Sequence, residues 1–432
     1  MVLTHHRIQQ PVGQGFFHTA MLVEDGSVFH YVFDCGSMST YKAARNARIK
    51  AYRKTVAPSQ VLDVLFISHA HADHLNGLEQ LLAPGLGVDT IVMPLLDAVD
   101  RLLAFGRDLV EDAASAQNVF YRDFIVDPAS ALGRFNPRQI LMIRPSHDGP
   151  GAPGSDGDGF GGPDGGRHIG IDPSQARLGW KAAGRGSVQI EDRKDQGGSD
   201  PLVALVDDTV AVAVPLKASK FWLLAPYVDP AVGVEQKRFK GALAAELRSS
   251  GAHALARKIN SLSAGDVAQI VKKHTAALSA AYASIAKNLN VTSLCLYSGL
   301  APQSSSLKGL YAWHSGHWQH SDAGAGERIG WLTTGDAALK ERHRRKSFLE
   351  HFGKLLARVV TLTLPHHGSD HNFDRELLTA TAAEMFVVAA ARYGTWRHPG
   401  SHVVQEVASA GRFVSVVTSS ESSVAWEWAS VE

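Results

Sequence analysis

The sequence predicts an α/β protein built from layers of strands and helices, and three observations support this fold class. Two short, nearly continuous apolar runs at 61–69 (VLDVLFISH) and 89–96 (DTIVMPLL) are typical of strands buried on both faces. A helical segment at 74–83 lies between them, which gives a strand–helix–strand unit. The last third of the chain returns to strand-like runs separated by helices. With 432 residues, of which 45% are hydrophobic, the chain can form one elaborated domain or two to three ordinary ones.

Charge and cysteine content exclude several classes of protein. The 43 basic and 42 acidic residues give a net charge of +1, which excludes binding to nucleic acid through bulk charge but leaves room for a local basic patch. No apolar run approaches the roughly 18 residues of a membrane span, and the first residues lack a signal-peptide core. The two cysteines are too few for a disulfide framework. We therefore expect a cytoplasmic protein without a membrane segment.

The first hundred residues begin with strands and continue with helices. Residues 15–37 contain two apolar runs separated by Glu24-Asp25-Gly26-Ser27, which predicts a hairpin. Residues 37–54 have a helical composition with a basic side formed by lysines and arginines. The strand at 61–69 follows this helix.

The middle of the chain is less regular. We expect a helix over 100–126, a strand at 139–144, and a mobile loop within 147–200, where Gly-rich sequence cannot bury enough surface to order itself. Residues 202–216 read as a hairpin that turns at Asp207-Asp208, and residues 220–228 as a further strand. An Ala-rich stretch at 230–288 is predicted to be a helical insertion. In the last third, strands are expected at 292–299, 328–336, 359–369, 384–391 and 412–418.

The strongest chemical signal is the run Ser68-His69-Ala70-His71-Ala72-Asp73-His74, at the end of a buried strand and the start of a helix. Crowding so many polar groups directly after a buried strand would be costly unless they shared a partner. Imidazole and carboxylate are ligands of Zn²⁺, Fe or Mn²⁺. The run therefore predicts a metal site.

This run resembles the second motif of the metallo-β-lactamase superfamily, and other motifs occur in the family's order. A strand ends in Phe33-Asp34-Cys35-Gly36, another ends in Thr334-Gly335-Asp336, and Pro365-His366-His367-Gly368 follows the next strand. The resemblance implies a four-layer αββα sandwich with a metal site at one edge of the paired sheets. Here the sandwich would carry helical and Gly-rich insertions.

The details are similar to the metallo-hydrolase domain of ComEC-type competence proteins, including Val12-Gly13-Gln14-Gly15 and Arg397-His398-Pro399. The resemblance covers about residues 10–97, 200–226 and 290–428. It implies that 1–97 is the first half of the fold and 290–432 the second. Residues 98–289 would hold the remaining core strands (about 139–144 and 203–226), the Gly-rich loop 147–200 and the helical insertion 230–288.

The resemblance also implies a ligand set for two divalent ions, which we expect to be Zn²⁺, with Mn²⁺ or Fe as alternatives. His69 and His71 would bind one ion, Asp73, His74 and His367 the other, and Asp336 both. Many relatives carry a further histidine in a third motif. Asn290 stands in the comparable place here, as in ComEC-like members, so the first ion would be held more weakly unless His314, His317 or His320 fills the gap.

Further residues are assigned roles around the ions. Asp73 could also orient the attacking water, His366 would face the substrate or support a ligand, and His398 could protonate a leaving group or hold a phosphate oxygen. Asp34 is expected to orient a ligand imidazole, although a strand-end aspartate can also start a turn. Asn290 and Ser369 are placed beside the ligands.

The predicted function is metal-dependent hydrolysis with a bridging hydroxide, acting on phosphodiester bonds of a nucleic acid or nucleotide. The basic residues at 45–54 and 342–346 could follow a phosphate backbone, but an ordinary solvated helix face is the alternative. A hydrolase of a lactone, thioester or β-lactam-like substrate, and a non-catalytic metal-stabilised binding subunit, are the other readings. The helical insertion could bind a protein partner, and the oligomeric state is left open.

Overall fold

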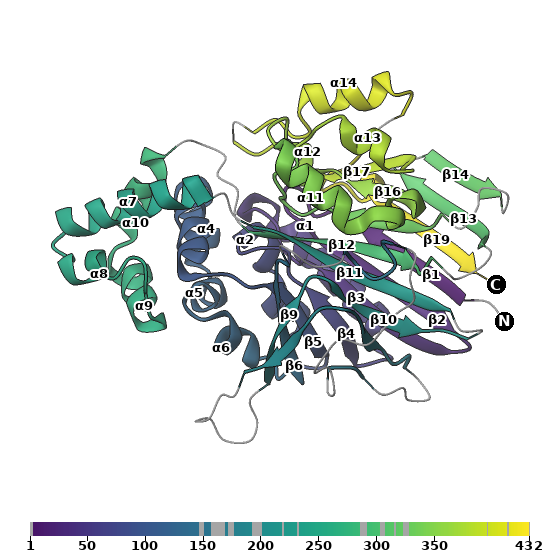
Figure 1. Cartoon of the computed structure of the whole chain (residues 1–432), viewed down its shortest axis with the longest axis horizontal. Helices are drawn as coiled ribbons and strands as arrows, with labels where there is room; N and C mark the ends of the chain where they lie inside the picture. The colour runs from purple at the N-terminus through teal and green to yellow at the C-terminus, as the bar shows by residue number, and fades with distance from the viewer. Residues whose placement is uncertain are drawn as a thin grey trace.

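The computed structural model has two β-sheets stacked face to face (Figure 1). It describes residues 3–146, 151–156, 169–171, 177–191, 201–217, 220–230, 233–285, 292–302, 307–314, 317–322, 328–394, 396–412 and 414–431. The N-terminal and C-terminal strands lie side by side, because β1 (Leu3–Gln9) pairs with β19 (Ala425–Val431) in antiparallel register.

The first sheet contains the predicted N-terminal hairpin and the parallel strands of the strand–helix–strand unit. Across the sheet the strands are β14 (His317–Asp322), β13 (Leu307–His314), β19, β1, β2 (His18–Glu24), β3 (Ser27–Phe33), β4 (Val61–Phe66), β5 (Gly87–Pro94), β6 (Gln139–Arg144), β9 (Leu202–Asp207) and β8 (Val188–Ile190). The strands from β3 to β6, and then β9, are parallel neighbours.

The second sheet is formed mainly by the last third of the chain. Its strands are β18 (Val414–Val417), β17 (Met385–Ala389), β16 (Val359–Thr363), β15 (Gly330–Thr333), β12 (Ser293–Leu300), β11 (Phe221–Asp229), β10 (Val210–Pro215) and β7 (Lys181–Gly184). The neighbours β15, β16, β17 and β18 are parallel, so their carboxyl ends lie at one edge of the sheet.

Three buried clusters define the layers of the sandwich. On β4, Val64 and Phe66 point to the other sheet and pack in a cluster with Trp222 of β11. Leu65 and Ile67, which alternate with them along the chain, pack in a different cluster together with helices. This alternation is the period-two pattern of a strand with both faces covered.

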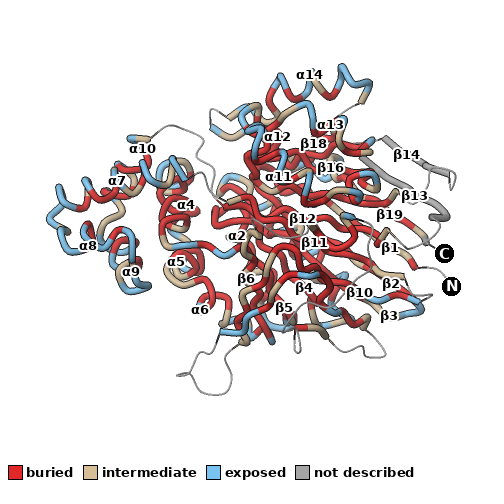
Figure 2. Tube along the Cα trace, in the orientation of Figure 1, coloured by how far each residue is buried: buried red, intermediate tan, exposed pale blue. Residues whose placement is uncertain are grey.

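Helices cover the outer face of each sheet, so the expected αββα sandwich is confirmed (Figure 2). The first sheet packs against α1 (Lys42–Val56), α3 (Leu78–Leu81), α4 (Ala98–Glu111), α5 (Val119–Val126) and α6 (Pro128–Gly133). The second sheet packs against α11 (Arg342–Phe352), α13 (Glu376–Ala380) and α14 (Ser401–Ser409).

The Ala-rich stretch forms four helices that lie beside α4 rather than on a sheet (Figure 1). They are α7 (Gly233–Ser249), α8 (His253–Arg257), α9 (Ala264–Lys273) and α10 (Thr275–Ser284). Helix α9 begins with a capping box, in which the Ser263 side chain and Asp266 satisfy each other's backbone N–H groups. Among the described residues, no helix combines the length and apolarity that a membrane crossing requires.

Two sequence expectations for the middle of the chain are wrong. Residues 202–216 do not form a hairpin, because β9 belongs to the first sheet and β10 to the second. The turn after Asp207 carries the chain from one sheet to the other, and the Asp208 side chain accepts a hydrogen bond from the Ser146 N–H (2.9 Å). The expected loop within 147–200 also contains β7 and β8; much of its Gly-rich part lies outside the described residues.

Candidate metal centre

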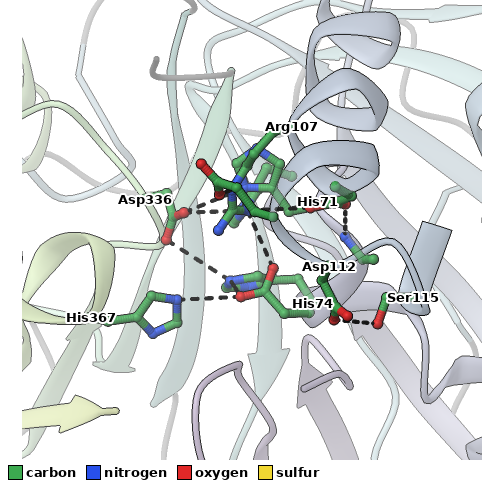
Figure 3. A network of polar contacts seen from close by, with 12 residues as sticks. His71, His74, Arg107, Asp112, Ser115, Asp336 and His367 are labelled. Atoms are coloured by element: carbon green, nitrogen blue, oxygen red, sulfur yellow. Dashed lines mark hydrogen bonds and ion pairs between the residues drawn. The ribbon is translucent and has the colours of Figure 1, made fainter. Parts of the chain in front are cut away.

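The candidate centre lies where strands from the two sheets end next to each other (Figure 3). His69 and His71 follow β4, and Asp73 and His74 lie in the short helix α2 (Ala72–Leu75). Asp336 follows β15 of the second sheet. The Leu294 N–H donates to the Ser68 carbonyl (2.8 Å), which joins the start of β12 to the end of the β4 segment.

One set of donors consists of Asp73, His74 and His367. The His367 Nε2 atom lies 3.6 Å from Asp73 Oδ2, and His74 Nε2 lies 4.0 Å from the same oxygen. His367 is oriented through its other ring nitrogen, which lies 2.7 Å from the Ala389 carbonyl oxygen. The three side chains are buried and lie close enough to share one metal ion.

The other set is formed by His69, His71 and Asp336. His69 Nε2 lies 2.9 Å from His71 Nδ1 and 3.3 Å from Asp336 Oδ2. His71 Nδ1 lies 3.6 Å from that same carboxylate oxygen. The second oxygen of Asp336, Oδ1, lies 3.9 Å from His74 Nε2, so this carboxylate faces both sets of donors.

Unpaired buried atoms in both sets fit divalent ions. Asp73 Oδ2, His74 Nε2, Asp336 Oδ2 and His367 Nε2 are all buried and have no hydrogen-bond partner among the described residues. Such groups are rarely left unpaired in a folded protein unless an ion or a water satisfies them. A set of imidazole and carboxylate donors is the chemistry that Zn²⁺, Mn²⁺ and Fe share.

Asp34, at the end of β3, contacts Ser68 and His74 on the side of these residues that faces away from the other donors. Its carboxylate accepts hydrogen bonds from the Ser68 N–H (2.7 Å) and the Ser68 hydroxyl (2.6 Å). It also lies 2.7 Å from His74 Nδ1. Because Nδ1 is occupied in this way, His74 Nε2 points toward the other donors.

Charges in the centre are set by burial and by neighbouring groups. Burial opposes protonation of His74, but the Asp34 and Asp73 carboxylates outweigh it and raise the pKa of His74 to about 9. Burial would raise the pKa of Asp73, but Arg107 and His74 outweigh it and hold this pKa well below its ordinary value. Burial lowers the pKa of His366 to about 4. Burial likewise opposes ionisation of Asp336, but the neighbouring histidines outweigh it and hold its pKa well below the ordinary value, so the Asp73 and Asp336 carboxylates are ionised at neutral pH.

Comparison with known proteins identifies a family for the first part of the chain. The family model described as "Metallo-beta-lactamase superfamily" matches residues 13–174. The chain carries a metallo-beta-lactamase superfamily domain. This is a superfamily of hydrolases that usually bind divalent metals. The matched segment includes Asp34 and the donors from His69 to His74, whereas Asp336 and His367 follow it in the sequence.

A solved structure described as "Crystal structure of unliganded yeast PDE1" is similar to the chain at 10% sequence identity. The similarity covers 99% of each chain, with a TM-score of 0.38. No curated protein matches the chain.

The sequence analysis missed Arg107, which α4 places beside the candidate metal centre. Its Nη1 atom lies 3.4 Å from Asp73 Oδ1, its Nε atom donates to Glu111 (2.8 Å), and its guanidinium lies 5.1 Å from the centre of the Trp396 ring. The side chain is buried. The sequence does place Arg107 and Glu111 at i,i+4 spacing on one helix, but this spacing alone does not reveal the contact with Asp73.

The remaining sequence-predicted residues have different surroundings. The His398 ring is half-buried, and its centre lies 6.1 Å from that of His366. Ser369 accepts a hydrogen bond from the His371 N–H (3.2 Å), which stabilises its own turn. Asn290 lies outside the described residues. The same holds for the side chains of the three alternative third-motif ligands: His314, His317 and His320.

The two basic clusters are divided between the surface and the interior. Four of their members are exposed, as expected for a solvated helix face, namely Lys50, Lys54, Arg342 and Lys346. Several arginines are instead used inside the fold. Arg344 is buried and lies 2.6 Å from Asp229, and Arg345 donates to Glu376 (2.7 Å). Arg45 is buried in α1, and Arg48 forms an ion pair with Glu421. These arginines lie on amphipathic helices whose inner face reaches the core, and composition alone could not show which face they take.

Proposed function

We propose that this chain is a metal-dependent phosphodiesterase that uses two divalent ions, with Zn²⁺ the best match for its donors. The position of Asp336 carries the proposal. One of its oxygens lies 3.3 Å from His69 Nε2, and the other lies 3.9 Å from His74 Nε2, so a single carboxylate faces both donor sets. When bound, a pair of divalent ions supplies a nucleophile at neutral pH and offsets charge on the attacked phosphoryl group.

The protein's own groups would hold these ions and orient the reactants. Asp34 and the Ala389 carbonyl fix the rings of His74 and His367, so that Nε2 of each ring faces the centre. Arg107 contacts one oxygen of Asp73, which leaves Asp73 Oδ2 to face the donors and the attacking water. Burial lowers the pKa of His398 to about 3. This ring is therefore neutral at pH 7 and suits hydrogen bonding to a phosphoryl oxygen better than proton donation.

Charge favours an anionic substrate over a neutral carbonyl compound. Two divalent ions and the Arg107 guanidinium would together slightly exceed the charge of the four nearby carboxylates, which belong to Asp34, Asp73, Glu111 and Asp336. The resemblance to ComEC-type domains, a branch associated with nuclease activity, points to the same substrate class. Because several arginines of the basic clusters are engaged inside the fold, the case for a nucleic acid rather than a nucleotide rests mainly on that resemblance.

The test is hydrolysis by the zinc- or manganese-reconstituted chain. Bis(p-nitrophenyl) phosphate, a dinucleotide and single-stranded DNA would be compared with lactone and thioester panels, with Asp73→Asn as the inactive control. We expect turnover of phosphodiesters that requires metal. Turnover of lactones or thioesters alone would replace the proposal with a carbonyl hydrolase. A chain that holds at most one ion and hydrolyses nothing would indicate a binding subunit.

A further inference from the structure

The turn after β16 carries two adjacent histidines whose rings reach different parts of the centre. His367 Nε2 lies 3.6 Å from Asp73 Oδ2. We call the set of Asp73, His74 and His367 the second donor set, and the set of His69, His71 and Asp336 the first. His366 Nε2 lies 3.6 Å from Asp336 Oδ2, in the first donor set. The His366 N–H also donates to the Gly335 carbonyl (2.9 Å), which fixes this residue next to Asp336.

The first donor set is short of protein ligands. The second set has Asp73, His74 and His367. The first has His69, His71 and an oxygen of the shared Asp336. His74 also lies close enough to His69 and Asp336 to share an ion with them, but it already belongs to the second set. A structural zinc ion is usually held by four ligands, and a catalytic one by three protein ligands and a water. A further imidazole would give the first ion a complete set.

Distances around Asp336 Oδ2 match the place of that ligand. Zn–N distances of about 2.0–2.1 Å imply that two ligand atoms of a tetrahedral ion lie about 3.3–3.4 Å apart. The distances from Asp336 Oδ2 are 3.3 Å to His69 Nε2, 3.6 Å to His71 Nδ1 and 3.6 Å to His366 Nε2. The distance from this oxygen to His366 Nε2 is therefore the same as its distance to the ligand atom of His71.

The backbone of this turn is strained, and binding of one ion by each histidine would explain why the strain is kept. His366 and His367 have φ angles of 49° and 55°, and Gly368 follows at 75°. A left-handed conformation is unfavourable for a residue that carries a side chain, because its Cβ comes too close to the following carbonyl oxygen. Such strain persists where surrounding interactions require it, and it concentrates at functional sites. In this turn the two successive left-handed residues direct their rings to two different carboxylates.

We propose that His366 is a direct ligand of the first ion, so that the Pro-His-His-Gly turn gives one imidazole to each ion. His366 would take the place that a third-motif histidine has in many relatives. The inference rests on the two-ion centre of the proposed function and extends it to the ligand set.

Metal stoichiometry after zinc reconstitution and dialysis tests this role directly. We expect close to two ions per chain in the wild type, close to one in His366→Gln, and two in His398→Gln, a matched change of a neighbouring ring. Circular dichroism would verify that each variant is folded. His366→Gln that retains two ions with wild-type resistance to a chelator overturns the proposal, as does a wild-type chain that holds fewer than two.

A second variant tests direct ligation through the appearance of an absorption band, so the conclusion does not depend only on the loss of a metal ion. In His366→Cys loaded with Co²⁺, a thiolate at the ion would produce a sulfur-to-cobalt charge-transfer band. We expect the wild type and His398→Cys to lack this band, because the side chains of Cys35 and Cys295 pack in apolar clusters and belong to neither donor set. Absence of the band in folded, cobalt-loaded His366→Cys would contradict direct ligation. These readouts do not depend on turnover, so a chain with two ions and no phosphodiesterase activity would refute the proposed function alone.

Discussion

Substitution of Asp34 by asparagine isolates the contribution of a residue that orients a ligand without belonging to either donor set. The carboxylate makes three contacts, with the Ser68 N–H (2.7 Å), the Ser68 hydroxyl (2.6 Å) and His74 Nδ1 (2.7 Å). An amide has the same shape but only one acceptor oxygen, so its NH₂ group must face Ser68 or the His74 N–H. The fold should survive, and the orientation of His74 should not.

We expect Asp34→Asn to bind its second ion about 10- to 100-fold more weakly, the usual cost of losing a residue that supports a metal-ligating histidine. This corresponds to about 1.4–2.8 kcal/mol of binding free energy. Competition with a chromophoric chelator would measure the affinity of each ion, and thermal unfolding of the metal-free chain would measure the cost to the fold.

Asp63→Asn is the matched control for this experiment. Asp63 is also buried, lies on the strand that leads to the centre, and accepts hydrogen bonds from the His30 N–H (2.7 Å) and Arg177 (2.5 Å). Its loss should lower stability and leave metal affinity unchanged. Equal metal affinities in Asp34→Asn and the wild type would refute the reasoning that Asp34 orients His74.

Three other perturbations have expected outcomes. Asp73→Ala should abolish hydrolysis in a folded chain, and wild-type-like turnover of the purified variant would remove Asp73 from the centre. Arg7→Met should lower the unfolding free energy by about 3–5 kcal/mol in urea denaturation, because it leaves the buried Glu427 carboxylate, 2.7 Å away, without its partner; a change below 1 kcal/mol would contradict this. Burial lowers the pKa of His18 to about 3 and that of His351 to about 4. Because these folded-state values lie below the unfolded value of about 6.5, the folded chain binds fewer protons, and stability should fall as the pH drops from about 6.5 to 4. Melting temperatures across this range would measure the fall, and a His351→Gln variant should show a shallower one.

The sequence was most informative where apolar runs end in polar residues. The parallel strands β4 and β16 are short and almost wholly apolar, and the residues after them supply most of the centre. The donors from His69 to His74 could be recognised because they crowd directly behind such a run. Asp336 and His367, some 260 positions later, could be joined to them only through the family resemblance.

Other features could not be read from composition. The alternating segment around Asp207 looks like a hairpin because two apolar strands flank a polar turn, and a crossing between sheets has the same pattern. Arg107 went unnoticed because its partner Asp73 lies 34 positions earlier, and only the packing of α4 brings them together. Along β1 buried residues alternate with half-buried ones, but the sequence does not alternate between apolar and polar residues, because His5 and Arg7 occupy buried positions. Arg7 is buried through contacts with residues near the other end of the chain.

The donors are divided between the two sheets, since His69 to His74 follow a strand of the first sheet and Asp336 and His367 follow strands of the second. Each donor set contains residues from both sheets. The bound cations would thus connect two halves that are otherwise held together by apolar packing and by a few hydrogen bonds, such as those from Arg7 to the Ser298 and Ile329 carbonyls. A small separation of the two sheets would release the ions while the helices and strands are still intact. During unfolding, a fluorescent zinc indicator should therefore respond before the circular dichroism signal changes.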